Sequence, residues 1–187
     1  CQKYNKYIIV DEVYLPLTNY ETVYCDKLEN SINFDKIIVI SSFAKYWAVP
    51  GWRVGWVLAN KEFIKKIIKL QSTIMTCAPN SSQIVCNHLL ENNFDPDLTI
   101  LKKSKEILSD IFIKKGWKLL ENKEISMYLF PIKNEVNIDS IIDKLLDNGL
   151  AVISGKCFGI DKGLRLTLPN NNDLLFKISE ILQKVLA

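Results

Sequence analysis

Two short, uninterrupted apolar runs constrain the fold of this chain more than any other feature. The first covers residues 7–10 and is followed by Asp11, and the second covers residues 36–40 and is followed by Ser41 and Ser42. Apolar residues that follow one another without alternation are typical of strands buried inside a parallel sheet. The stretch between the runs is long enough for the crossover connection that parallel strands require. We therefore predict an α/β fold with a mainly parallel sheet.

The rest of the chain divides into two kinds of pattern. Before Gly116 we expect a third strand and three helices, at residues 52–58, 61–71, 80–92 and 97–114. After it the expected elements are four short strands and two helices. The strands cover residues 117–120, 126–132, 150–154 and 164–168, and the helices cover residues 138–148 and 171–186. Such a mixture is typical of a small α+β domain. We place the domain boundary so that residues 1–98 form the first domain and residues 99–187 the second.

Composition excludes several classes of function. No apolar run approaches the roughly 18 residues that a membrane span needs. The basic residues are scattered among acidic ones, and lysine-rich stretches such as residues 61–69 and 102–105 are typical of solvated helix faces. No sustained basic stripe indicates nucleic-acid binding. The five cysteines are widely spaced and form no C-x-x-C pair, which argues against a disulfide framework and a metal site. Free thiols are typical of reducing compartments, so we expect a cytoplasmic protein.

Arginine is rare in this chain and its positions are informative. The 24 basic residues include only two arginines, Arg53 and Arg165. A chain that otherwise uses lysine is expected to keep arginine where a planar, two-pronged contact to a phosphate or carboxylate is needed. Five of the seven glycines lie within ten residues of one arginine or the other, as expected where backbone makes room for a ligand. Because the arginines fall in different predicted domains, we expect the ligand site between the domains.

Chemically useful side chains gather near the predicted ends of the parallel strands. Asp11 ends one strand, Ser42 ends the next, and Lys45 follows three residues later; Arg53 follows a Pro-Gly turn. Ligands of open parallel sheets bind at the carboxyl ends of the strands. An acid, a hydroxyl, an amine and a guanidinium at one edge suit an anionic cofactor that carries a basic ring nitrogen and an aldehyde.

These residues carry a resemblance to a known family. The segment 42–55, SFAKYWAVPGWRVG, resembles the lysine motif of class I/II aminotransferases, which are pyridoxal-phosphate (PLP) enzymes of fold type I. The segment 11–14, DEVY, resembles the Asp-x-x-Tyr segment of that family, and the segment 155–159 followed by Arg165 resembles its carboxylate-binding region. The resemblance covers essentially the whole chain and is nearest to the tyrosine, alanine and aspartate aminotransferase branches.

The resemblance implies a role for each cofactor-binding residue. Lys45 would form a Schiff base with PLP and then act as the acid and base on the substrate. Asp11 would pair with the pyridinium nitrogen and keep the ring an electron sink. Tyr14 would hydrogen-bond the phenolic oxygen of the ring. Ser42 and Arg53 would hold the phosphate.

The resemblance also implies a substrate site and an incomplete chain. Arg165 would bind the α-carboxylate of an amino acid or a 2-oxo acid. The chain would be the C-terminal part of the large PLP-binding domain followed by the small domain, within a full-length protein that is a homodimer. We expect the chain alone to transaminate poorly. A sheet that lacks strands would expose an edge and an apolar face, so poor solubility or dimerisation is also expected.

Other readings stay open at the level of sequence. The same fold hosts C–S lyases and decarboxylases, and it also occurs as a non-catalytic PLP-binding sensor domain. An inactive piece that serves only in assembly is a further alternative. Taken singly, Asp11 could form an Asx turn, Ser42 a helix cap and Tyr14 a packing contact. The sequence does not select the substrate pair or the oligomeric state.

Overall fold

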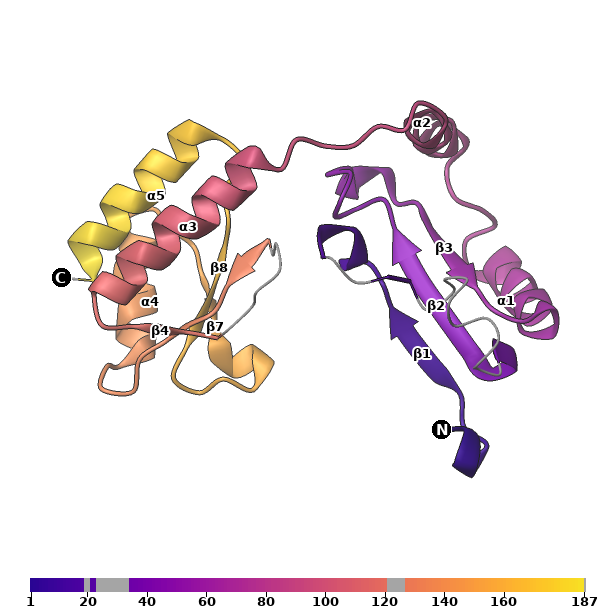
Figure 1. Cartoon of the computed structure of the whole chain (residues 1–187), viewed down its shortest axis with the longest axis horizontal. Coiled ribbons are helices and arrows are strands. Elements are labelled where there is room, and N and C mark those ends of the chain that lie inside the picture. Colours follow the sequence, from indigo (N-terminus) through magenta and orange to yellow (C-terminus); the bar gives the residue numbers. More distant parts are fainter. Residues whose placement is uncertain (19–20, 23–33, 121–126, 187) are drawn as a thin grey trace. The chain divides into compact units, whose positions relative to one another are not determined.

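The chain forms two compact units, Cys1–Pro96 and Asp97–Ala187 (Figure 1). The computed structural model describes residues 1–18, 21–22, 34–120 and 127–186. The first unit contains β1 Ile8–Asp11, β2 Ile37–Ser42, β3 Gly55–Leu58, α1 Lys61–Ile74 and α2 Asn80–Glu91. The second unit contains α3 Thr99–Lys114, β4 Lys118–Leu119, β5 Tyr128–Leu129, β6 Pro131–Ile132, α4 Ile138–Asp147, β7 Ile153–Ser154, β8 Leu164–Thr167 and α5 Asn172–Val185.

The first unit is built on a three-stranded sheet in the order β1-β2-β3 (Figure 1). Strands β1 and β2 are parallel, as the two apolar runs predict, and β3 is antiparallel to β2. The central strand β2 is buried, and Val39 at its middle is fully inaccessible to solvent. Because β3 runs the opposite way, its first residue lies at the same edge of the sheet as the last residues of β1 and β2.

The prediction that both apolar runs are buried is wrong for β1. Ile8 and Ile9 are 38% and 68% exposed. The reason is the position of the strand, since within the described residues β1 pairs with β2 alone and forms an edge of the sheet. Apolar side chains on an edge strand of this kind are suited to burial against further polypeptide.

The third strand begins three residues later than predicted. Pro50–Trp52 form a single 3₁₀ turn, and Arg53 adopts a left-handed conformation with φ 55°. Neither conformation can continue a β-strand, so pairing with β2 starts only at Gly55. The Pro-Gly turn thus places Arg53 outside the sheet, two residues before β3.

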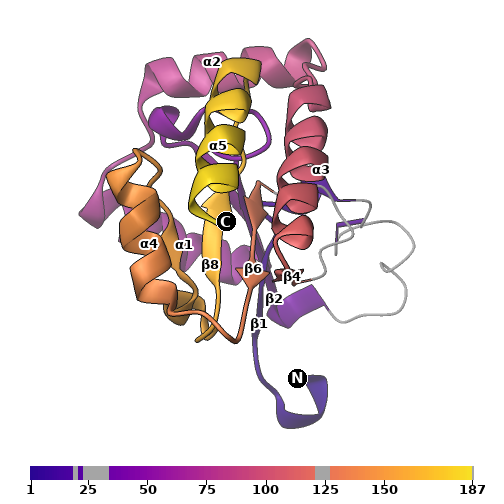
Figure 2. The same cartoon turned by 90° about the vertical axis from the view of Figure 1, so that its left-hand side faces the viewer.

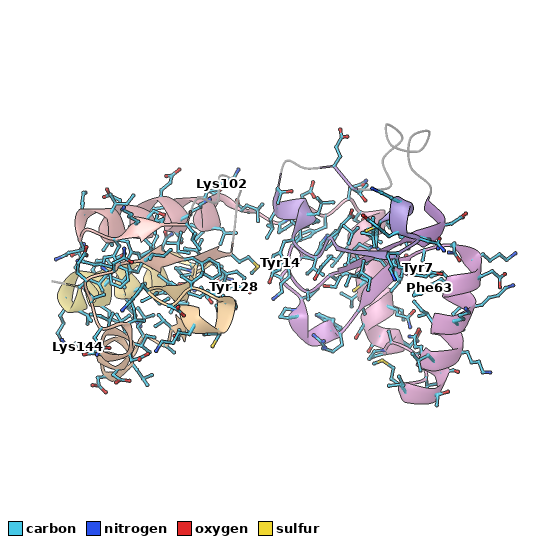
Figure 3. The ribbon with its side chains drawn as sticks, turned by 90° about the horizontal axis from the view of Figure 1, so that it is seen from below. Tyr7, Tyr14, Phe63, Lys102, Tyr128 and Lys144 are labelled. Carbon is cyan, nitrogen blue, oxygen red and sulfur yellow. The ribbon has the colours of Figure 1, made fainter. Side chains whose placement is uncertain are left out.

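Helix α1 has a well-defined start and a longer course than predicted. The side chain of Asn60 accepts a hydrogen bond from the Phe63 N–H at 2.9 Å, which satisfies one of the free donors at the helix start. The ring of Phe63 lies 5.9 Å from that of Tyr7, which fixes the helix against the start of β1 (Figure 3).

Within the described ranges, every helix is too short or too polar to cross a lipid bilayer.

The second unit packs three helices around a set of short strands. Helix α5 contacts both α3 and α4 and lies between them (Figure 2). Leu108 and Phe112 of α3 are fully buried at the centre of the hydrophobic core, and the ring of Phe112 lies 5.6 Å from that of Trp117. The mixture of helices and short antiparallel strands is the α+β arrangement predicted for this half of the chain.

Side chains of strand β8 alternate between the two faces of its sheet. It pairs antiparallel with β5 on one side and β7 on the other. Leu164 and Leu166 are each 1% exposed and point into the core, so Arg165 between them lies on the opposite face. The strand predicted at 126–132 is interrupted at Phe130, which separates β5 from β6, and Ser126 lies outside the described residues.

The exposed strand β1 generates a prediction about association. We expect the 187-residue chain to self-associate through β1, and Ile9→Lys to shift it toward monomer, because a charge on an edge strand opposes strand addition. Sedimentation velocity measures the distribution. Leu146→Lys, at another exposed apolar position on α4, is the matched control and should leave association unchanged. A wild-type chain that sediments only as a monomer would contradict this prediction.

Candidate active site

Asp11 stands at the carboxyl end of β1 and begins a tight turn. Its Oδ1 accepts a hydrogen bond from the backbone N–H of Val13 at 3.0 Å, which is the Asx turn considered from the sequence. The backbone N–H of Glu12 donates to the Ile40 carbonyl at 2.8 Å and holds the turn against β2. Asp11 is exposed and is the last residue of β1.

Ser42 ends β2 and opens the loop that carries the lysine. Its hydroxyl accepts a hydrogen bond from the Ala44 N–H at 3.3 Å, and the residue pairs with Gly55 across the sheet. The neighbouring Ser41 is buried, and its hydroxyl donates to the Glu12 carbonyl at 3.2 Å. This bond joins the end of β2 to the turn that follows Asp11.

Lys45 reaches back toward the segment that follows β1. Its Nζ lies 5.4 Å from the centroid of the Tyr14 ring, within the range of a cation–π contact. Tyr14 belongs to the first unit and is labelled in Figure 3. The contact brings together two residues that are 31 positions apart in the sequence and that the sequence assigned to one site.

The lysine loop is packed by an aromatic cluster that the sequence analysis did not identify. The buried ring of Phe43 lies 4.8 Å from that of Trp47 and 5.2 Å from that of Trp56 on β3. Trp47 also donates its indole N–H to the Phe94 carbonyl at 3.2 Å. Because these rings flank Lys45 in sequence, their packing limits the positions that the amine can reach. The sequence does contain five aromatic residues within positions 43–56, but they match no chemical motif.

Tyr46 provides a second attachment for the same loop. Its hydroxyl donates to Oδ1 of Asp95 at 2.8 Å. Partial burial of the phenol, followed by this hydrogen bond and the negative charge of Asp95, raises the pKa of Tyr46 above its usual value. The phenol therefore stays protonated and keeps its donor role at neutral pH.

Arg53 is exposed and held by the turn that precedes β3. Its Nη1 donates to the Pro50 carbonyl at 3.0 Å, and its backbone is left-handed. Gly55 follows as the first residue of β3 and pairs with Ser42 of β2. A Cβ at this position would lie 2.7 Å from the Ser41 carbonyl oxygen, so a side chain larger than hydrogen does not fit. The glycine lets the chain enter the sheet directly after Arg53.

Arg165 lies in the second unit, on the outer face of β8. Its guanidinium carbon is 4.6 Å from the centroid of the Tyr128 ring and 4.9 Å from that of Phe158. Its Nε is buried and has no hydrogen-bond partner among the described residues. The structure thus gathers the other predicted site residues at one edge of the first unit and places Arg165 on the second. The expected site between the domains stays a prediction.

The first unit offers a defined set of chemical groups at the edge where β1 and β2 end. They comprise a carboxylate, a phenol, a hydroxyl, an amine and a guanidinium, from Asp11, Tyr14, Ser42, Lys45 and Arg53. No group of three or more His, Cys, Asp or Glu in the described part of the chain is arranged to bind a metal ion. The set can bind an anionic group through its cation and hydroxyl and an aldehyde through its amine.

Comparison with known proteins gives one family for the chain. The model of the family described as aminotransferase class I and II matches residues 1–176. The chain is 30% identical over 189 residues to the (5-formylfuran-3-yl)methyl phosphate transaminase of Methanocaldococcus jannaschii, covering 95% of this chain and 50% of that protein. It is 30% identical over 159 residues to an aspartate aminotransferase of Thermotoga maritima, covering 84% of this chain and 41% of that protein.

Comparison with solved structures also finds aminotransferases. The crystal structure of an aspartate aminotransferase from Thermotoga maritima superposes with a TM-score of 0.80 at 25% identity, over 98% of this chain and 48% of that one. A Methanococcus jannaschii protein, whose active site is described as similar to those of kynurenine aminotransferases, gives a TM-score of 0.81 at 26% identity. That match covers 100% of this chain and 52% of the other. The chain therefore spans about half the length of the relatives it matches.

The close approach at Gly55 generates a prediction about stability. We expect Gly55→Ala to lower the free energy of unfolding of the first unit by roughly 1–3 kcal/mol, because the added methyl group must displace the Ser41 backbone. Urea unfolding followed by tryptophan fluorescence measures this, since Trp47 and Trp56 report on the unit. Gly51→Ala is the control, because no atom lies within 4 Å of its added Cβ. Equal stability of the two variants would contradict the prediction.

Proposed function

The chain belongs to the aminotransferase class I and II family, and from this premise we propose that its protein is a PLP-dependent aminotransferase. The proposed reaction moves an amino group from an amino acid to a 2-oxo acid. The observation that carries the proposal is the approach of the Lys45 amine to the Tyr14 ring, at the edge of the sheet where Asp11 ends β1. Because the chain spans about half of its relatives, the proposed activity is that of the whole protein.

The donor set of the first unit fits PLP. The exposed carboxylate of Asp11 suits a protonated ring nitrogen, and the phenol of Tyr14 suits the phenolic oxygen of the ring. The hydroxyl of Ser42 and the guanidinium of Arg53 suit the phosphate. The amine of Lys45 suits the aldehyde. When bound, PLP supplies an electron sink for the charge left as a proton leaves the substrate α-carbon.

Each residue then has a physical task. The negative charge of Asp11 favours retention of the proton on the ring nitrogen. Lys45 Nζ would hold the cofactor at its aldehyde, and the same amine would carry the proton that leaves the substrate α-carbon. Arg53, which has a left-handed backbone and donates to the Pro50 carbonyl, would hold the phosphate through its guanidinium. Arg165 binds the substrate carboxylate and orients the bond to be broken.

We further propose that the whole protein is a cytoplasmic homodimer. The cysteines described as free thiols, Cys1, Cys77, Cys86 and Cys157, support a reducing compartment. The exposed apolar residues of β1 support burial against further polypeptide in the whole protein. Assignment of the first unit to a large PLP-binding domain and of the second to a small domain rests on the same premise.

The covalent role of Lys45 can be tested on the chain itself. We expect PLP to give a visible absorbance band and, after borohydride reduction, a PLP-sized mass increase on the peptide containing Lys45. Lys45→Ala should lose both signals, because the reacting amine is gone. Lys144→Ala, an exposed lysine on α4 labelled in Figure 3, is the control and should keep both. Labelling spread over several lysines without preference for Lys45 would contradict the assignment.

The type of reaction can be tested on the whole protein in a single half-reaction. Transfer predicts that one equivalent of amino acid yields pyridoxamine phosphate and a 2-oxo acid. Release of ammonia, a thiol or carbon dioxide would instead indicate a lyase or a decarboxylase on the same fold. Tight PLP binding without turnover of any amino acid would indicate the sensor domain. The named relatives favour transfer, since both are aminotransferases.

A further inference from the structure

The guanidinium of Arg165 is held by aromatic rings rather than by carboxylates. Arg165 and Tyr128 lie diagonally on the same face of the β5-β8 pair, because Tyr128 is opposite Thr167 in the register. Diagonal neighbours on one face are within reach of an aromatic side chain, and the ring centroid lies 4.6 Å from the guanidinium carbon. Phe158 contributes a second ring at 4.9 Å.

The charge of Arg165 has no protein partner within the described ranges. No ion pair joins it to a described Asp or Glu, and its Nε is buried without a hydrogen bond. A cationic group held in this way remains available to an external anion. The planar form of the group further selects an anion that can accept two parallel N–H bonds, such as a carboxylate.

Phe158 is placed by the backbone of a short glycine-rich loop. Gly155–Phe158 form a 3₁₀ turn, and the Gly155 N–H donates to the Gly163 carbonyl at 2.8 Å. A Cβ on Gly155 would lie 2.6 Å from that same carbonyl oxygen, so the turn can lie against the start of β8 only with glycine. Gly159 then ends the turn with φ 73°. The loop therefore brings the Phe158 ring to Arg165 as a consequence of its backbone.

A third ring packs against Phe158. Phe130 lies 5.5 Å from Phe158 in an edge-to-face contact. Such contacts restrict the rotation of a ring that is otherwise 43% exposed. Phe158 is therefore a partly exposed aromatic whose motion is restricted by a neighbouring ring.

We propose that Tyr128 and Phe158 are positioning residues that clamp the Arg165 guanidinium and hold its plane ready for a substrate carboxylate. Only the identity of that carboxylate, as part of an amino acid or a 2-oxo acid, rests on the proposed function. An unclamped arginine loses side-chain entropy when it binds, and a clamped one has lost much of it already. Lysine cannot replace it, because an ammonium group has no plane to stack.

The scarcity of arginine makes the clamp directly measurable. With only two arginines, the ¹⁵N–¹H spectrum of the chain contains two arginine Nε–H signals, which Arg53→Lys assigns by removing one. We expect the Arg165 signal to be displaced by the nearby ring faces and to exchange slowly with water, since its Nε is buried. Phe158→Leu should move this signal toward that of Arg53 and speed its exchange, and Phe158→Tyr should restore it.

Carboxylate binding is measured by titrating the same signal with propionate, with neutral propionamide as the blank. We expect propionate alone to shift the Arg165 signal, and Phe158→Leu to weaken its affinity by about twofold to fivefold, the size of an exposed cation–π contact. Phe176→Leu replaces an aromatic ring that is 65% exposed on α5 and is the matched control. Thermal unfolding should be alike in both variants, which separates positioning from loss of structure.

Two results would count against the proposal in different ways. If Phe158→Leu matches Phe176→Leu in both the Nε–H signal and the propionate affinity, the clamp is overturned whatever the function. If Phe158→Leu moves the Nε–H signal but propionate shifts Arg165 in no variant, the stack is real and the carboxylate-binding role is overturned. The second result would also contradict the substrate role given to Arg165 in the proposed function.

Discussion

The register between β2 and β3 is the constraint on which the candidate cofactor site depends. Ser42 lies opposite Gly55, and a Cβ added at Gly55 would lie 2.7 Å from the Ser41 carbonyl oxygen. Since side chains alternate along a strand, a slip of one residue would turn every side chain of β3 to the other face. Residues 43–54 connect β2 to β3, with Lys45 near the start of this connection and Arg53 near its end. The register between the two strands fixes both ends of the connection. Both are therefore positioned by the same backbone contact.

The two units fix their arginines by different physical means. Arg53 is directed by its own left-handed backbone and by a bond to the Pro50 carbonyl. Arg165 is directed by aromatic rings on a neighbouring strand and a loop. In both units the cation is oriented by contacts that leave it able to meet an anion. Binding sites that are preorganised in this way lose less entropy when the ligand arrives. We propose that this requirement explains the retention of arginine at these positions in a lysine-rich chain.

The sequence was sufficient where one residue or one local pattern decides the structure. The apolar runs predicted the parallel pair β1 and β2, and periodicity predicted α4 closely. It failed for the burial of Ile9, because exposure of an edge strand depends on which other strands are present. It also failed at residues 52–54, where a 3₁₀ turn and a left-handed arginine delay the start of the predicted strand to Gly55. The contact between Phe158 and Arg165 was missed because it arises only when a loop folds onto β8.

The central claim is that Asp11, Tyr14, Ser42, Lys45 and Arg53 surround a single ligand. The most direct measurement is a crystal structure of the whole protein with PLP. The account predicts continuous density between Lys45 Nζ and the aldehyde carbon, the Asp11 carboxylate within hydrogen-bond distance of the ring nitrogen, and the phosphate on Ser42 and Arg53. Density for the cofactor elsewhere, or joined to another lysine, would contradict the account.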